Sequence, residues 1–182
     1  EGEEVIGLDL LDDFYDPGIK RANLAAARGH DRFREVHGDI RDAGLLASLP
    51  ADVDAIVHLA GRAGVRPSIL APDLYTSVNL AGTVALLELA RARGIRSFVF
   101  ASSSSVYGDN EKVPFAETDP VDHPISPYAA TKKAGELMAH NYAHLWKQPV
   151  TAVRFFTVYG PWGRPDMALF KFVSSILKGE PI

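Results

Sequence analysis

Residues 54–59 read DAIVHL and residues 97–102 read SFVFAS, and a long helical segment over residues 72–93 separates them. Each run has the length and the apolar content of a buried strand. Gly94 follows the helical segment directly and is the residue type that ends helices. A strand, a helix and a second strand in this order predict two parallel strands joined by a crossover helix.

The same alternation extends outward in both directions along the chain. The patterns predict further strands at residues 4–9, 33–37 and 150–156, and further helices at residues 19–28, 42–49, 126–146 and 168–178. Strands that alternate with helices are typical of an α/β fold, here a Rossmann-like, doubly wound parallel sheet. Such sheets bind ligands beyond the carboxyl ends of their strands.

The composition narrows the classes of protein and partner. The chain has 182 residues, 47% of them hydrophobic, and a net charge of −4 without a dense run of Lys or Arg. Nucleic acid is therefore disfavoured as a partner, and no run is apolar enough to predict a membrane span. The absence of cysteine excludes disulfides and thiolate zinc sites and fits a cytoplasmic protein. His140 and His144 share a helix face with Glu136 but lack a fourth ligand, so no metal site is expected.

Residues 126–132 read SPYAATK and begin the helix predicted over residues 126–146. Tyr128 and Lys132 are four residues apart, so they lie on one face of that helix. A neighbouring ammonium group stabilises a phenolate, and a phenolate can take a proton from an alcohol. The spacing also arises by chance on helix surfaces, but two further motifs accompany it: FASSSSVYG at 100–108 and RFFTVYGPWGRPDM at 154–167.

Small or polar residues follow each of the expected strands. These residues are Asp9, Asp39, Ala60-Gly61, Ser102–Ser105 and Phe156-Thr157. An acid at the end of a strand can accept two hydrogen bonds from an adenosine ribose, and it favours NAD over NADP; the alternative is a loop or helix cap. Arg66, Arg154 and Arg164 are candidates for binding phosphate or carboxylate groups, although a solvated surface position is the commoner role for any one arginine. Arg164, in a loop rich in Gly and Pro, is the strongest of the three candidates.

The glycine-rich loop that binds dinucleotide phosphates does not precede Asp9 in this sequence. A first strand, that loop and a first helix would need about 30 residues. We therefore expect a fragment that is incomplete at its N-terminal end.

Taken together, FASSSSVYG, YAATK, GDIRD at 38–42 and RFFTVYGPWGRPDM resemble the extended short-chain dehydrogenase/reductase family, also known as the NAD-dependent epimerase/dehydratase family. Within it, the chain is most similar to the UDP-glucuronate 4-epimerases. The resemblance implies NAD-dependent epimerisation at C4 of a UDP-sugar, most simply UDP-glucuronate to UDP-galacturonate, through a 4-keto intermediate. It also implies a homodimer that forms through the helices expected at residues 72–93 and 126–146. The family has a larger C-terminal region, so the resemblance implies that the chain is incomplete at its C-terminal end as well. Residues 1–160 would form an NAD-binding Rossmann-like domain without its first β-α unit, and residues 161–182 would begin a substrate-binding region.

The resemblance also assigns roles to individual positions of this chain. The catalytic residues would be Tyr128, Lys132 and Ser103. The cofactor would contact Tyr128 and Lys132 together with Asp9, Asp39, Ile40, Leu59, Ala60, Gly61, Asn79, Ser102, Phe155 and Phe156. The sugar would contact Tyr128 and Ser103 together with Arg66, Ser104, Ser105, Thr157 and Arg164.

Other reactions of the same family remain as alternatives. A 4,6-dehydratase needs an Asp-Glu acid/base pair after the catalytic Ser or Thr, and Ser104 and Ser105 stand there instead, so dehydration is disfavoured. A UDP-glucose 4-epimerase and a UDP-glucuronate decarboxylase are the closest alternatives. A nucleotide-binding fragment without catalytic activity is the alternative from a different class.

Overall fold

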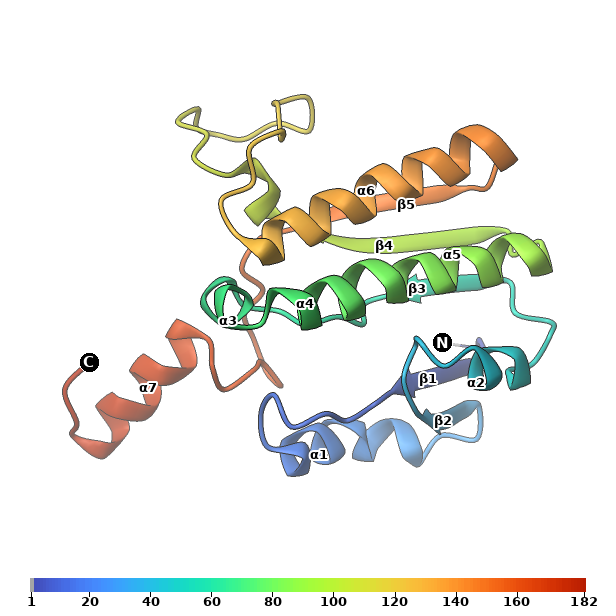
Figure 1. Ribbon diagram of the computed structural model, residues 1–182. Helices are drawn as coiled ribbons and strands as arrows, with labels where there is room; N and C mark the ends of the chain where they lie inside the picture. Colours follow the sequence, from blue (N-terminus) through green and yellow to red (C-terminus); the bar gives the residue numbers. More distant parts are fainter. Residues whose placement is uncertain (1) are drawn as a thin grey trace. The chain divides into compact units, whose positions relative to one another are not determined.

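The structure, a computed structural model, describes residues 2–182, in which strands and helices alternate along the chain (Figure 1). The strands are β1 (Val5–Asp9), β2 (Phe33–His37), β3 (Ala55–His58), β4 (Ser97–Ser103) and β5 (Val150–Phe155). The helices are α1 (Pro17–Arg28), α2 (Ala43–Ser48), α3 (Val65–Leu70), α4 (Pro72–Tyr75), α5 (Gly82–Arg93), α6 (Pro127–Trp146) and α7 (Ala168–Lys178). Each expected strand is present within two residues of its expected ends, and all pair in parallel, which confirms the α/β class.

The chain divides into two compact units. The first unit contains the residues up to Asp39 together with Thr157–Ile182, and the second contains Ile40–Phe156. In the first unit, β1 and β2 pair in register from Val5 opposite Phe33 to Asp9 opposite His37. The α1 helix begins where the Asp16 side chain accepts a hydrogen bond of 2.7 Å from the Gly18 amide, as an N-cap does.

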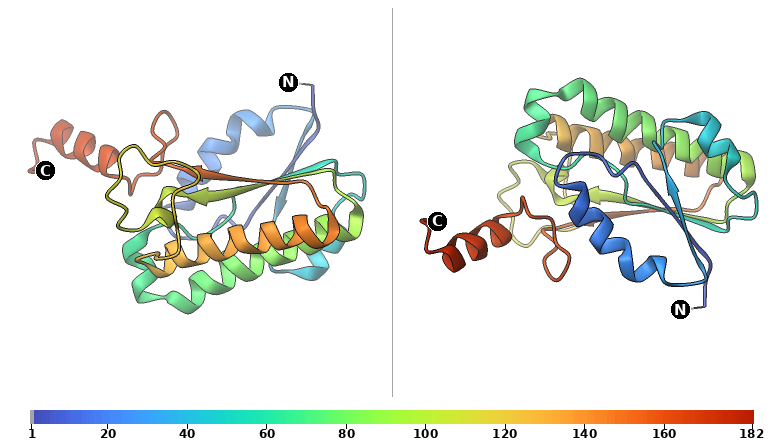
Figure 2. Two further views of the ribbon diagram at one scale, coloured as in Figure 1. Left: turned by 90° about the horizontal axis from the view of Figure 1, so that it is seen from above. Right: turned by 90° about the horizontal axis from the view of Figure 1, so that it is seen from below.

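The second unit is a three-stranded parallel sheet in the order β3-β4-β5. The α5 and α6 helices lie side by side on one face of this sheet, as both Figure 1 and Figure 2 show. Phe98 and Phe100 of β4 are buried beneath them, with Leu87 and Ala90 of α5. Apolar burial of this kind is the main source of stability for the second unit.

The α6 helix packs closely on β4 because Gly135 lacks a side chain. A Cβ atom at Gly135 would overlap the Phe100 ring, well inside van der Waals contact. The backbone of α6 can therefore rest on the ring itself. The approach fixes the height of α6, and with it Tyr128 and Lys132, above β4.

The segment expected as one helix over residues 72–93 is more complex than its sequence pattern predicts. It runs through α4, a π-helical segment η1 (Thr76–Ala81) and α5 without leaving the helical path. A π-helical turn inserts an extra residue into the helix and is frequent at functional sites. The wider turn carries Asn79, which is buried. The short α3 helix was not expected from the sequence, because Gly64 and Pro67 flank and interrupt its pattern.

The loop over residues 108–126 is held by Asp119. Its carboxylate accepts hydrogen bonds from the Ala116 amide at 2.8 Å and from Asn110 Nδ2 at 3.3 Å, and it pairs with Lys112. The Lys112 partner, followed by the Ala116 amide, lowers the pKa of Asp119. No helix among residues 2–182 is long and apolar enough to cross a membrane.

His58 is a buried histidine at the carboxyl end of β3. Its Nε2 atom lies 2.9 Å from Thr83 Oγ1, whose own hydroxyl donates to the Asn79 carbonyl at 2.5 Å. Because the Thr83 proton is used there, His58 Nε2 carries the proton and donates to Thr83 Oγ1. Burial and, to a smaller degree, the Lys132 ammonium lower the pKa of His58 to about 3. The imidazole is therefore neutral in the folded protein.

We expect Gly135→Ala to lower the free energy of unfolding by about 1–3 kcal/mol, because the new methyl group must displace the Phe100 ring or lift α6. Urea denaturation measures the change. The matched control is Gly29→Ala at the end of α1, where a Cβ atom would meet its nearest neighbour at 3.7 Å. Equal stability of the two variants would contradict the tight approach of α6 to β4.

We expect His58 to make the protein less stable in acid. Its folded pKa of about 3 lies below the ordinary value of 6.5, so between these limits the unfolded chain binds a proton that the folded chain does not. The free energy of unfolding should therefore fall as the pH drops from 6.5 towards 3, by about 1.4 kcal/mol per pH unit from this one group. Urea titrations at several pH values should show a shallower slope for His58→Phe. The exposed His140→Gln serves as the control and should keep the wild-type slope.

Candidate active site

The site is built around the first two turns of α6. Ser126 caps the helix, because its Oγ accepts a hydrogen bond of 3.1 Å from the Ala129 amide. Tyr128 and Lys132 follow on successive turns, as the sequence predicts. The Lys132 ammonium is buried and donates to the Ala101 carbonyl of β4 at 2.7 Å. Burial lowers the pKa of Lys132 to about 8, so the ammonium keeps its proton at neutral pH and loses it in mildly basic solution.

The Tyr128 ring is oriented by a second tyrosine that the sequence analysis did not identify. Tyr75 of α4 meets the Tyr128 ring edge to face, with ring centroids 6.3 Å apart and an interplanar angle of 85°. Tyr75 is itself fixed, since it is buried and its hydroxyl donates to the Ala63 carbonyl at 2.7 Å. Edge-to-face packing restricts the rotation of both rings. No local sequence pattern marks Tyr75, because its role depends on a residue 53 positions later in the chain.

Ser103 is the last residue of β4, opposite Phe155 in the register with β5. Its Oγ accepts a hydrogen bond of 3.1 Å from the Ser105 amide, which begins the short 3₁₀ helix η2 (Ser104–Tyr107). Lys132 binds the backbone of β4 only two residues earlier, at Ala101. The end of β4 and the start of α6 therefore bring Ser103 and Lys132 into one region of the second unit, as expected.

Asn79 connects the turn after β3 to α6. Its Oδ1 accepts from the Arg62 amide at 2.7 Å, and its Nδ2 donates to the Arg62 carbonyl at 2.9 Å and to Thr131 Oγ1 at 3.1 Å. Thr131 precedes Lys132 directly. Asn79 thus holds the position of the turn and of the helix at once, through contacts made entirely within the protein.

Gly61 has no side chain, so its backbone is exposed beside Lys132. A Cβ atom there would lie 3.0 Å from Asn79 Oδ1 and 3.5 Å from Lys132 Nζ, so the backbone of the turn approaches both groups closely. Bare backbone beside a buried ammonium is the surface that a ribose or a phosphate can approach. The residues of this turn therefore fit the dinucleotide that the sequence predicts there.

The other expected site residues of the second unit differ in how far they are buried. Ile40 is buried against Gly82 at the start of α5, whereas the Leu59 and Phe156 side chains are exposed. Arg66 lies exposed on α3. The buried Ser102 hydroxyl donates to a carboxylate oxygen of Glu136 at 2.5 Å. Contact of these side chains with a ligand stays a prediction.

The first unit holds the remaining expected residues, among them Asp39, Asp9 at the end of β1, Thr157 and Arg164. Asp9 Oδ1 accepts a hydrogen bond of 2.6 Å from the Leu11 amide, which leaves its second oxygen without a role in that turn. Arg164 pairs with Asp166 at 3.1 Å and lies 5.7 Å from the centre of the Phe14 ring. Arg164 thus already has a carboxylate partner within the first unit.

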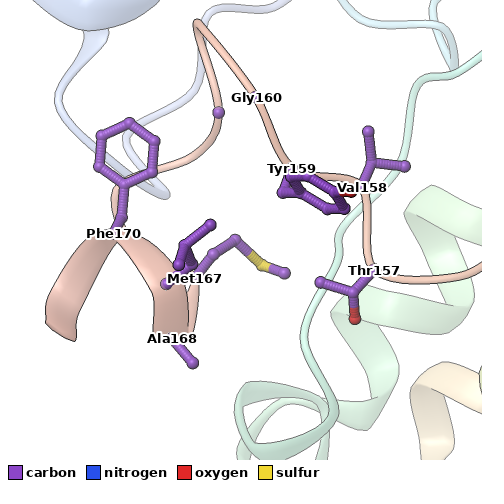
Figure 3. Close-up of a pocket in the computed structure, with 9 residues that line it drawn as sticks. Thr157, Val158, Tyr159, Gly160, Met167, Ala168 and Phe170 are labelled. Carbon is purple, nitrogen blue, oxygen red and sulfur yellow. The ribbon is translucent and has the colours of Figure 1, made fainter. Parts of the chain in front are cut away.

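Thr157 lines a small, mainly apolar cavity of about 150 Å³ at the start of the segment that leads to α7. Met167 extends from the opposite wall towards the Tyr159 ring, and Phe170 of α7 closes another side (Figure 3). The cavity lies wholly within the first unit. Its size suits a side chain or a small fragment of a ligand rather than a whole nucleotide-sugar.

Comparisons with known sequences agree on one family. The family model described as the NAD dependent epimerase/dehydratase family matches residues 1–182. A probable UDP-glucuronate 4-epimerase of Rhizobium meliloti is 50% identical over the whole chain, and UDP-glucuronate 4-epimerase 1 of Arabidopsis thaliana is 52% identical. The chain covers 54% and 43% of these two relatives, so it spans about half the length of the curated proteins that it matches.

Solved structures of the same fold include two kinds of enzyme. A dTDP-glucose 4,6-dehydratase from Streptomyces venezuelae with NAD bound superposes with a TM-score of 0.90 at 39% identity, covering 98% of this chain and 54% of that one. A UDP-glucuronic acid 4-epimerase from Bacillus cereus, in complex with UDP-glucuronic acid and NAD, gives 0.86 at 33% identity, covering 98% and 56%. With its parallel α/β fold, its paired Tyr128 and Lys132 and a family model that matches its whole length, the chain belongs to the NAD-dependent epimerase/dehydratase family.

Proposed function

We propose that the chain forms the cofactor-binding and catalytic part of an NAD-dependent enzyme that epimerises C4 of UDP-glucuronate. One observation carries the proposal above all others. The α6 helix places Tyr128 one turn before a buried Lys132, and the Lys132 ammonium is fastened to β4 two residues before Ser103. The similarity to curated UDP-glucuronate 4-epimerases supports the choice of substrate.

NAD, when bound, would supply an acceptor and donor of hydride. We propose that Gly61 and its neighbours Leu59 and Ala60 pass beneath it, that Lys132 donates to its ribose, and that Asp9 accepts from the adenosine ribose. Asp39 and Ile40 would flank the adenine. Asn79, Ser102, Phe155 and Phe156 complete the set of proposed cofactor contacts, with Asn79 acting through the turn that it holds.

The reaction would depend on Tyr128 in both directions. Its phenolate would take the proton of the sugar 4-hydroxyl when C4 is oxidised to a ketone, with NAD as the oxidant. The Lys132 ammonium would stabilise the phenolate, and Ser103 would hold the sugar oxygen by a hydrogen bond. After the keto sugar turns over, C4 would be reduced from its other face by the same cofactor, and Tyr128 would return the proton to the sugar oxygen, so that neither the cofactor nor the proton is consumed.

The choice of epimerisation over dehydration rests on two side chains. Elimination of water from the sugar needs a carboxylic acid and a carboxylate after the catalytic hydroxyl residue, and η2 offers Ser104 and Ser105 instead. A serine hydroxyl is too weak an acid and too weak a base to replace this carboxyl pair at neutral pH. We propose that both serines contact the sugar, together with Arg66, Thr157 and Arg164 around its carboxylate.

We also propose that two segments of the chain bind different ligands. Residues 1–160 would bind the cofactor, and residues 161–182 would begin the substrate-binding region. The relatives of about twice this length support the division, since they contain further sequence on which a nucleotide could be held.

The test of the proposed function is Tyr128→Phe. We expect it to abolish conversion of UDP-glucuronate to UDP-galacturonate, because no other group on α6 takes the proton, while the fold stays intact. Proton NMR follows the two sugars in time, with NAD added, for this chain and for the longest reading frame that contains it. Tyr142→Phe is the matched control, since it removes another tyrosine hydroxyl from α6, one that donates to Glu88.

Three outcomes would contradict the proposal. Conversion by Tyr128→Phe at the wild-type rate would remove the tyrosine from the mechanism. A folded, full-length protein that binds NAD and converts no UDP-sugar would favour a nucleotide-binding protein without catalytic activity. Formation of a UDP-pentose with release of CO₂ would identify a decarboxylase instead.

We propose that two copies of the protein associate through α5 and α6. These helices lie side by side on one face of the sheet (Figure 1). The α6 helix exposes Leu137 and Leu145, each with 57% of its surface accessible. Exposed apolar side chains on a helix are typical of an interface between two copies, which two neighbouring helices from each copy can form. We expect sedimentation equilibrium to give a dimer for the wild type and a monomer for Leu137→Asp. Arg21→Asp, a change of charge at an exposed position of α1, should leave the dimer intact, and a monomeric wild type would overturn the proposal.

A further inference from the structure

A bidentate ion pair joins Arg154, near the end of β5, to Glu136 on α6. Arg154 Nε donates to Glu136 Oε1 and Arg154 Nη2 donates to Glu136 Oε2, both at 2.9 Å. The pair is bidentate and mostly buried, with side-chain exposures of 19% for Arg154 and 11% for Glu136. Two parallel hydrogen bonds fix both the distance and the angle between the two groups.

The same two side chains reach three more parts of the second unit. Glu136 Oε1 also accepts from the Ser102 hydroxyl of β4 at 2.5 Å. Arg154 Nη1 donates to the Glu117 carbonyl in the loop over residues 108–126 at 3.2 Å, and the guanidinium lies 5.0 Å from the centre of the Tyr107 ring. Arg154 thus has a partner within the second unit for each of its three nitrogens.

Both members of the pair are ionised at neutral pH. Burial opposes ionisation of Glu136, but hydrogen bonds from Arg154 and Ser102 outweigh it and hold the pKa of Glu136 below its ordinary value. The hydrogen bonds to Glu136 raise the pKa of Arg154 further above neutrality. Both groups therefore remain charged, and the pair does not act as an acid or a base.

The position of the pair in the sequence links it to the reactive residues. Tyr128, Lys132 and Glu136 follow one another at intervals of four, so they form a single stripe along α6. Lys132 fastens this stripe to Ala101, and Glu136 fastens it to Ser102, the next residue of β4. Ser103 follows at once. A movement of Glu136 would change the position of α6 over the very residues that must act together.

From these contacts we propose that Glu136 and Arg154 are positioning residues: together they hold Tyr128 and Lys132 of α6 in place over Ser103 of β4. The inference rests on the proposed function for its kinetic consequence, but its structural consequence can be measured without any activity. A lysine at position 154 keeps the positive charge and loses the planar fork. A glutamine at position 136 keeps the shape of the side chain and loses its charge.

The experiment is a double-mutant cycle in the full-length protein with Glu136→Gln, Arg154→Lys and the double variant. We expect kcat for epimerisation to fall about 10- to 100-fold in each single variant with KM within about twofold of wild type, because a small displacement of reacting groups slows turnover without weakening binding. The double variant should fall no further than the slower single variant, since both changes break the same contact. Arg28→Lys is the matched control, because it removes the fork from the exposed bidentate pair with Glu35.

Hydrogen–deuterium exchange of the same proteins, without substrate, separates positioning from general stability. In Arg154→Lys we expect faster exchange in the first two turns of α6 and in η2, and unchanged exchange in α1 and α2. A variant with normal kcat, or with kcat losses that multiply in the double variant, would overturn the proposal. Uniformly faster exchange throughout the protein would also overturn it, in favour of a purely stabilising ion pair. If the wild type converts no UDP-sugar, the proposed function fails, and the exchange pattern still decides whether the pair positions α6.

Discussion

The buried ammonium of Lys132 constrains the whole second unit. An unpaired charge in an apolar interior is costly, so Lys132 must have oxygen atoms within reach. The carbonyl of Ala101 provides one of them, at 2.7 Å, and it can do so only because α6 lies close to β4. Gly135 permits that approach, since any side chain there would strike Phe100. The packing of Gly135 on Phe100 thus fixes the position of the Lys132 ammonium, one turn earlier in α6.

An ammonium group has three hydrogens, and one carbonyl uses only one of them. The remaining donors of Lys132 lie beside the bare backbone of Gly61 and the fully bonded side chain of Asn79. Burial lowers the pKa of Lys132 to about 8. On the proposed function, a ribose hydroxyl of the cofactor would accept a further hydrogen bond from this ammonium group and offset part of the free-energy cost of burying it.

Much of this arrangement could be predicted from the sequence, because its signals are local. Apolar runs such as residues 54–59 identify the strands, and the spacing of Tyr128 and Lys132 requires nothing beyond helical geometry. The contacts that could not be predicted join residues far apart in the chain. By its sequence Arg154 is a candidate for binding an anion, yet it pairs with Glu136, which a periodic pattern describes only as a polar position of a helix. The π-helical segment η1 is likewise invisible to periodicity, because the helix continues on both sides of it. Sequence patterns identify the reactive residues, whereas tertiary packing selects the residues that hold them.

The fold alone does not decide which reaction occurs at this site. A dTDP-glucose 4,6-dehydratase and a UDP-glucuronic acid 4-epimerase both match the chain closely, with TM-scores of 0.90 and 0.86. Oxidation at C4 needs only the residues that both reactions would share: a phenolate, its lysine and a hydroxyl. The fate of the oxidised sugar depends on the groups next to that hydroxyl, and here they are Ser104 and Ser105 at the start of η2. On the proposed function, Ser104 and Ser105 offer no carboxylic acid to protonate a leaving hydroxyl, so the 4-keto sugar would keep its hydroxyl groups until C4 is reduced again, and reduction from the other face is epimerisation. These two side chains would therefore favour epimerisation over dehydration.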